Sequence, residues 1–292
     1  MGLTKTPLAL PRTPRGLVLI ALTLCLSACV RPEPTFTGLP RSYQVVVDDL
    51  QIHSDREFTQ DDPLFAELRQ VRKEVQELFE LPPPTRPIVV YLFDGEERYA
   101  DYMQTRHPNL PPRRAFFIGS PTELAVYAHW SPNMMEDLRH EYTHGVLHAS
   151  LRTVPLWLDE GIAEYFETRT RDSRRIHDEH AKRLALALSQ GWRPNLQRLE
   201  NLTQVNEMGS ADYQEAWAWV HYLIHDTPAG RELLVDYCRA LRKSTDPPRF
   251  SDRVNEYFPD CDTRLASYVA ISLRNADPTG IQRVSDNRVE WD

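Results

Sequence analysis

The spacing of apolar residues changes near residue 130, and this change restricts the chain to a fold with two unlike halves. Before that point, short runs rich in β-branched and aromatic residues predict strands, which alternate with two helical patterns. After it, apolar residues recur at helical spacing and no strand pattern follows. The sequence therefore predicts an α+β fold, in which a small N-terminal mixed sheet with its helices precedes a mostly helical half.

Residues 43–274 are predicted to form a single domain that contains both halves. In the first half, residues 43–130, the predicted strands are 43–48, 88–93, 115–118 and 123–127. Its predicted helices begin at Asp61 and Glu96, and the prolines from Pro82 onward end the first of them. In the second half, residues 131–274, helices are expected over about 132–149, 157–168, 177–190, 212–226, 230–243 and 262–273. A polar tail, residues 275–292, follows the domain.

Residues 1–28 have the pattern of a secretory signal. An apolar run from Gly16 to Ala28, too short to span a bilayer, follows three basic residues, Lys5, Arg12 and Arg15. The run ends in L-S-A-C, which resembles a bacterial lipobox, and this resemblance implies that Cys29 becomes the lipidated N-terminus. An ordinary cleaved signal is the alternative.

The residues around Cys29 also indicate a location. Val30 follows the cysteine where an Asp would indicate retention in the inner membrane, so we expect an outer-membrane anchor that faces the periplasm. Residues 29–42, which contain three prolines, are predicted to be an extended tether. Cleavage would remove three positive charges and no negative ones, and so change the net charge from −8 to −11. An acidic chain of this kind is not expected to bind nucleic acid.

Only two cysteines, Cys238 and Cys261, would remain as thiols after cleavage and lipidation. In an oxidising compartment they form either a single disulfide or a pair of buried free thiols, and both alternatives stay open at this point.

The segment H-E-Y-T-H, residues 140–144, is an H-E-x-x-H motif inside a predicted helix. Residues four apart lie on one helix face, so the imidazoles of His140 and His144 can bind one Zn²⁺ ion. Glu141 then lies beside the open coordination position, where a carboxylate can take a proton from water. A motif this short arises by chance in roughly two chains per hundred of this composition, so a coincidental motif in a helical binding protein is an alternative.

A second segment, W-L-D-E-G-I-A-E-Y over residues 157–165, strengthens the metal prediction. A zinc site needs a third protein ligand, and Glu160 follows His144 at a distance that allows a helix, a short loop and a second helix. Over about residues 135–168, the two segments resemble the gluzincins, the thermolysin-like and aminopeptidase-like zinc peptidases. The resemblance is strongest to the small bacterial peptidase MA-like branch of that group.

The resemblance implies a role for each matching residue. The zinc ligands of the family match His140, His144 and Glu160, and its general base matches Glu141. Asp159 and Glu164 match positions whose side chains hydrogen-bond the ligating imidazoles. Asp159 stands where the family often has Asn, and Glu164 where thermolysin-like members have Asp. Glu164 is also an alternative third ligand, because it shares a helix face with Glu160.

The first residue of a later helical pattern, Tyr213, has two interpretations. In aminopeptidase-like gluzincins, a tyrosine in a comparable place donates its hydroxyl to the oxyanion of the tetrahedral intermediate. A tyrosine among Trp and Val residues at helical spacing is also typical of a core, and the two interpretations carry equal weight. His148 is expected to line or pack the cleft wall, and His221 and His225 are expected to be structural or exposed.

The expected function is therefore that of a peptidase with one Zn²⁺ ion per chain, acting on a peptide or protein at the bacterial cell envelope. The strand at residues 123–127 is expected to be an edge strand that holds an extended substrate. A zinc-binding envelope lipoprotein with a scaffolding role and no catalytic activity is the alternative.

Overall fold

The computed structural model describes residues 38–273, except for 49, 85 and 170–173. The predicted signal, Cys29, residues 29–37 of the tether and the tail lie outside the described residues. All of the described residues belong to one compact unit. This unit has a small mixed sheet followed by helices, which confirms the predicted α+β fold.

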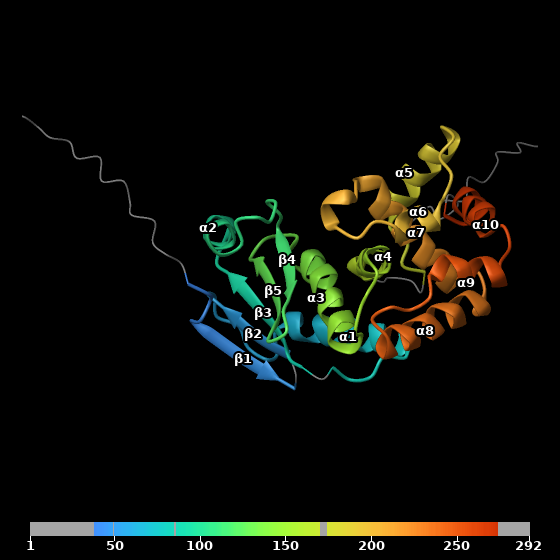
Figure 1. Cartoon of the computed structure of the whole chain (residues 1–292). Helices are drawn as coiled ribbons and strands as arrows, with labels where there is room; N and C mark the ends of the chain where they lie inside the picture. Colours follow the sequence, from blue (N-terminus) through green and yellow to red (C-terminus); the bar gives the residue numbers. More distant parts are fainter. Residues whose placement is uncertain (1–37, 49, 85, 170–173, 274–292) are drawn as a thin grey trace, which may run out of the picture. The chain divides into compact units, whose positions relative to one another are not determined.

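The first half forms a five-stranded sheet in the order β1-β2-β3-β5-β4 (Figure 1). Its strands are β1 (Tyr43–Val47), β2 (Leu50–Ser54), β3 (Ile88–Phe93), β4 (Ala115–Gly119) and β5 (Leu124–His129). The three central strands β2, β3 and β5 are parallel, whereas β1 and β4 are antiparallel to their neighbours at the two edges. Every residue of β3 and β5 is buried, as expected for parallel strands covered on both faces.

The edge strand next to the helical half is β4, so the prediction that residues 123–127 form this edge was wrong. The strand in that place, β5, hydrogen-bonds to β3 on one side and to β4 on the other. A strand that is buried at all six positions requires partners on both sides, and the hairpin turn then carries β4 to the outside. Strand β2 was not predicted from the sequence: Leu50 and Ile52 do alternate with Gln51 and His53, as in a half-buried strand, but the pattern is only five residues long.

Two helices of the first half lie on opposite faces of the sheet. Helix α1 (Pro63–Phe79) packs its apolar side against one face, in the same core as the later helix α3, and α2 (Glu96–Arg106) covers the other. The side chain of Asp62 caps α1 by accepting a hydrogen bond from the amide of Leu64, and Pro63 occupies the first turn.

The second half is helical, as predicted. Its helices are α3 (Met134–Ser150), α4 (Leu156–Glu167), α5 (Asp178–Ser189), α6 (Leu196–Glu200), α7 (Ser210–His225), α8 (Pro228–Lys243), α9 (Phe250–Tyr257) and α10 (Cys261–Tyr268). A 3₁₀ turn at Val205–Glu207 precedes α7, and a π-helical turn at Val269–Leu273 follows α10. Helices α6 and α9 have no counterpart in the sequence prediction, because so few turns display little periodicity. None of the helices in the described part of the chain combines the length and apolar character that a membrane span requires.

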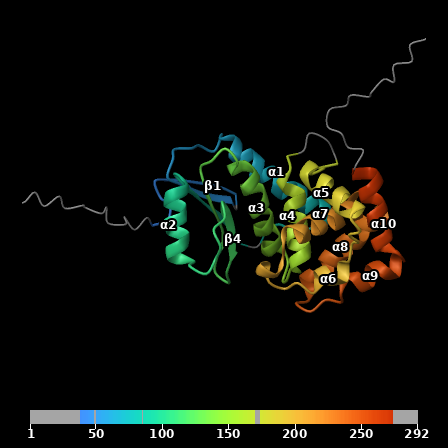
Figure 2. The same ribbon diagram turned by 90° about the horizontal axis from the view of Figure 1, so that it is seen from above.

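Two glycines allow the central helices to pack closely. A Cβ atom on Gly145 of α3 would lie 3.0 Å from Cγ2 of Ile88 in β3. A Cβ atom on Gly161 of α4 would lie 2.6 Å from the carbonyl oxygen of Ala216 in α7. Helix α4 packs against α7 on one side and α3 on the other, as Figure 2 shows.

The two cysteines are free, buried thiols, so the structure has the second of the two predicted alternatives. Burial raises the pKa of Cys238 to about 12 and that of Cys261 to about 11, which keeps both thiols protonated at neutral pH. The Sγ atom of Cys261 donates a hydrogen bond to Oδ1 of Asn255 at 3.2 Å.

Candidate metal centre

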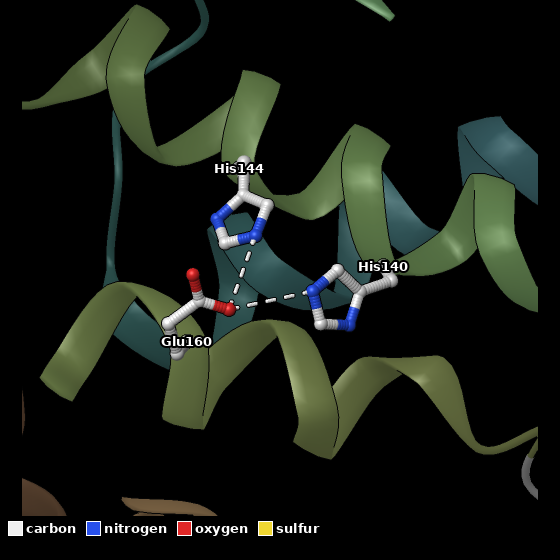
Figure 3. A group of neighbouring side chains, drawn as sticks. All are labelled: His140, His144 and Glu160. Atoms are coloured by element: carbon white, nitrogen blue, oxygen red, sulfur yellow. Dashed lines mark ion pairs between the residues drawn. The ribbon is translucent and has the colours of Figure 1, made fainter. Parts of the chain in front are cut away.

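Helices α3 and α4 bring together the three residues that the sequence suggested as metal ligands (Figure 3). His140 and His144 lie one turn apart on α3, and Glu160 reaches them from the neighbouring helix α4. Oε2 of Glu160 is 3.5 Å from Nε2 of His140 and 3.7 Å from Nε2 of His144. The three side chains therefore present one nitrogen or oxygen atom each toward a common point.

The spacing of these atoms fits a metal ion better than a set of hydrogen bonds. A hydrogen-bonded nitrogen and oxygen lie about 2.9 Å apart. Two ligands that each lie about 2.1 Å from one tetrahedral ion are instead about 3.4 Å apart. Glu160 is only 5 % exposed, and its Oε2 has no hydrogen-bond partner among the described residues. A buried carboxylate oxygen without a partner is unfavourable, and a cation at this point would stabilise it, so these residues could hold a metal ion.

Two carboxylates fix the orientation of the imidazoles. Asp159 Oδ1 lies 2.8 Å from Nδ1 of His144, and Glu167 Oε2 lies 2.9 Å from Nδ1 of His140. A carboxylate accepts a hydrogen bond from a protonated Nδ1, so the Nε2 atom of each ring is left to face Glu160. Asp159 thus lies where the sequence placed it, whereas Glu167 had not been identified.

Glu164 was expected to hydrogen-bond one of the ligating imidazoles, but it contacts a different histidine. Its carboxylate lies 2.8 Å from Nε2 of His180 in α5. Helices α3 and α4 run antiparallel, and the residue of α4 that hydrogen-bonds Nδ1 of His140 is Glu167, about one turn beyond Glu164. The motif does not specify which acidic residue of α4 reaches that nitrogen.

Two further groups near this site have ligand atoms close enough for a metal ion: Glu164 with His177 and His180, and His140 with Glu164 and Glu167. In the first group, Glu164 and His180 lie at hydrogen-bond distance from each other. Its two imidazoles are stacked with their centroids 3.7 Å apart. In the second group, Glu167 is hydrogen-bonded to His140. The group of His140, His144 and Glu160 differs from both, because its nitrogen–oxygen distances of 3.5 and 3.7 Å are longer than hydrogen bonds.

The carboxylates change the protonation of the imidazoles in the metal-free protein. Burial alone would lower the pKa of His144, but the charge and hydrogen bond of Asp159 raise it to about 9. In the same way, Glu160 and Glu167 outweigh burial and raise the pKa of His140 well above its usual value. Burial opposes the charged form of Asp159 too, yet His144 and His148 hold its pKa well below the usual value. The carboxylates therefore favour protonated imidazoles when no metal is bound.

Glu141 follows the candidate ligand His140 in α3 and contacts the edge strand of the sheet. Its Oε2 accepts a hydrogen bond of 2.6 Å from the amide of Phe117 in β4. That amide therefore points away from β5, toward the open edge. The ring of Phe117 lies beside the imidazoles of His144 and His148, with centroid separations of 6.1 and 5.2 Å. The contact joins the sheet half to the helical half at the site.

Tyr213, in the first turn of α7, lies near this site and is only half-buried. Burial, followed by the charge of Glu160, raises the pKa of its hydroxyl. The hydroxyl oxygen accepts a hydrogen bond of 3.1 Å from Nη2 of Arg113. Arg113 had not been identified from the sequence, since it lies in a proline-rich segment without a motif. Two consecutive arginines just before a strand are the only signal there.

The other histidines that the sequence singled out are not among these ligands. His148 Nε2 lies 2.8 Å from Oδ2 of Asp159 and so adds a second contact to that carboxylate. His221 is buried and contacts the hydroxyl of Tyr268, while His225 contacts the hydroxyl of Tyr165. Both of the latter contacts are structural, as expected.

The helical half is similar to a known protein family. Residues 136–248 match the model of a protein family that is described as a protein of unknown function (DUF1570). The matched segment contains His140, Glu141, His144, Glu160 and Tyr213, but none of the strands. None of the curated proteins compared with the chain matches it.

Metal binding can be tested directly. We expect the chelator-treated protein to take up one equivalent of added Zn²⁺, as measured by mass spectrometry of the metal after desalting. His144→Ala and Glu160→Gln should each weaken this binding at least 100-fold, because each removes one of three protein ligands. His107→Gln, which changes a histidine outside the candidate groups, serves as the control. Full zinc binding by His144→Ala would contradict the site.

The pKa of His144 gives a second prediction, for the metal-free protein. Because the folded-state pKa is raised to about 9, the stabilisation by its proton is complete below the unfolded value of about 6.5 and is lost as pH rises through about 9. His144→Gln should therefore destabilise the metal-free protein more at pH 6 than at pH 10, by roughly 3 kcal/mol at most. Denaturant unfolding of both proteins at the two pH values measures this difference. An equal effect at both values would show that the imidazole does not gain this stabilisation.

Proposed function

We propose that the protein is a zinc-dependent peptidase, in which His140, His144 and Glu160 hold the ion. The observation that carries the proposal is the place of Glu141, which follows His140 in α3 and whose carboxylate contacts the amide of Phe117 on an open sheet edge. A purely structural metal site has no use for a further carboxylate beside it. Two imidazoles and one carboxylate are the protein ligands typical of catalytic zinc, with a fourth position left open.

A zinc ion bound here supplies Lewis acidity, which makes a water molecule easier to deprotonate and polarises the scissile carbonyl. Asp159 and Glu167 hold the two imidazoles in the tautomer that presents Nε2. Such orienting contacts commonly change metal affinity or activity 10- to 100-fold.

Glu141 is suited to move the proton in this reaction. Its Oε2 is held by the amide of Phe117, and no hydrogen bond engages Oε1 among the described residues. In the proposed mechanism Oε1 accepts a proton from the attacking water and then delivers it to the leaving amine. The contact with Phe117 fixes the carboxylate between substrate strand and ligands.

Tyr213 and Arg113 are suited to stabilise negative charge on the carbonyl oxygen. Since the Tyr213 oxygen accepts a hydrogen bond from Arg113, its own O–H proton is free to be donated elsewhere. A donor aimed at the developing oxyanion contributes to catalysis because it interacts more strongly with the transition state than with the substrate. The guanidinium adds positive charge on the same side.

The edge of β4 provides a place for an extended substrate. Its backbone pairs with β5 on one side only, so its outward amides and carbonyls, apart from the Phe117 amide that Glu141 occupies, can bind a peptide as an additional strand. Glu141 contacts this row at Phe117. A peptide bound along it would therefore pass beside the proposed general base.

We also propose that the enzyme acts at the bacterial cell envelope, anchored through lipidated Cys29. This part rests on the signal and lipobox patterns of the sequence alone. A zinc-binding lipoprotein with a scaffolding role is the alternative, and an intact general base beside the ligands argues against it.

The role of Glu141 can be separated from metal binding. Glu141→Gln should retain one equivalent of zinc and the same unfolding midpoint, because Gln keeps an oxygen that accepts from Phe117. It should cleave peptides about 10²- to 10⁴-fold more slowly, because an amide is not a general base. Cleavage of a mixed peptide library, followed by mass spectrometry, measures this loss. Wild-type cleavage rates in Glu141→Gln would rule out the mechanism.

The role of Tyr213 distinguishes an oxyanion donor from a core residue. Tyr213→Phe should leave the unfolding free energy nearly unchanged and lower kcat by about 10²- to 10³-fold, with little change in KM. Tyr222→Phe, at another position of the same helix, is the control and should keep full activity. If Tyr213→Phe lowers stability and leaves kcat unchanged, the core interpretation holds.

A further inference from the structure

A cavity of about 560 Å³ lies on the face of the sheet opposite to the candidate metal centre. Helix α2, the segment 108–114 and the edge strand β4 surround it. Its volume is within the range typical of small-ligand sites. Phe116 of β4 lines it, while the next residue, Phe117, contacts Glu141 and His144 on the other face. The cavity and the metal centre therefore share one edge strand.

The wall of the cavity is largely apolar and rigid. Met103 and Phe116 line it together with three prolines, Pro108, Pro111 and Pro112. Prolines have fixed φ angles, so little conformational entropy is lost when a ligand packs against them. Leu110 also lines the cavity and is 40 % exposed, which is unusual for a large apolar side chain in this protein. An exposed apolar concavity of this kind is typical of a binding site.

Two polar aromatic side chains also line the cavity. Tyr99 and His129 are nine-tenths or more buried, and their rings lie 5.3 Å apart. Neither the hydroxyl of Tyr99 nor Nδ1 of His129 has a hydrogen-bond partner among the described residues. Both atoms are closed to solvent and therefore to the cavity, so they offer no hydrogen bond to a ligand there.

Strand geometry relates the cavity to the substrate. A peptide that pairs with the outward edge of β4 extends the sheet, and its side chains alternate between the two faces. Side chains of one parity would point to the face of α3, where Glu141 and Phe117 lie. Side chains of the other parity would point to the face of α2, where the cavity opens beside Phe116.

We infer that this cavity binds a large apolar side chain of the substrate peptide, at a position close to the scissile bond. The inference rests on the proposed peptidase function and names its substrate class: peptides with an aromatic or long aliphatic residue there. Arg113, which lines the cavity and also donates to Tyr213, links side-chain binding to the proposed oxyanion donor.

The test fills the cavity without disturbing the core. Ala100 of α2 lines the cavity and is exposed, so Ala100→Trp places an indole in it. Thr105→Trp adds the same side chain at an exposed position of α2 that does not line the cavity, and it is the matched control. Peptides that differ only in having Phe, Leu or Ala at each position around one bond are digested by the zinc-loaded proteins.

Wild type and Thr105→Trp should prefer the Phe and Leu peptides to the Ala peptide by about 10- to 100-fold in kcat/KM. Ala100→Trp should lose this preference and still cleave the Ala peptide at the wild-type rate. A wild type without the preference, or an Ala100→Trp variant that keeps it, would overturn the inference while leaving the proposed function intact.

If wild type cleaves none of the peptides, the proposed function fails and the cavity is tested by binding. Fluorescence anisotropy of labelled Phe and Ala peptides is then measured on zinc-loaded wild type, Ala100→Trp and Thr105→Trp. Tighter binding of the Phe peptide that only Ala100→Trp abolishes supports the cavity as a peptide side-chain site. Equal binding of both peptides overturns it.

Discussion

A buried carboxylate that faces two imidazoles is the constraint on which the rest of this structure depends. Removing the charge of Glu160 from water costs several kcal/mol unless positive charge compensates for it. In the metal-free protein, protonated His140 and His144 can supply that charge, and the carboxylates of Glu167 and Asp159 stabilise the positive rings. With a metal ion, the same three atoms become ligands. The packing of α3 against α4 thus buries a negative charge that a proton or a metal cation must neutralise.

The chemistry proposed for the site draws on both halves of the fold. The helical half supplies the ligands, the general base and Tyr213, whereas the sheet half supplies β4 and Arg113. Two hydrogen bonds cross between the halves at this point, from Phe117 to Glu141 and from Arg113 to Tyr213. The edge strand would therefore bind the substrate and position the general base at the same time.

The sequence predicted the parts of the site that depend on local spacing. His140 and His144 follow from the four-residue repeat of one helix, and Asp159 is adjacent to Glu160 in a short motif. Glu167 could not be predicted, because its contact depends on the register of α4 against α3. Arg113 and Phe117 meet the site only through tertiary structure, and no motif marks them.

The same dependence on local spacing decides which elements of the fold could be predicted. Long helices such as α3 and α7 display enough periodicity to be predicted within about two residues, whereas α6 and α9 are too short. Strands β4 and β5 were both predicted, but apolar alternation does not say which of two strands lies inside a sheet. That choice depends on the pairing of β5 with β3, which is distant in the sequence.

Each of the two ligand-bearing helices has a glycine immediately after a candidate ligand: Gly145 follows His144, and Gly161 follows Glu160. On the side turned away from the ligand, these glycines bring each helix close to a neighbouring element, and at Gly161 that neighbour is the main chain of α7. At Gly161, where the close neighbour is a carbonyl oxygen, main-chain separation sets the helix spacing, so apolar side chains elsewhere in the core can change without moving Glu160. A search for H-E-x-x-H-G followed by E-G would therefore select other chains by their helix spacing as well as by their ligands.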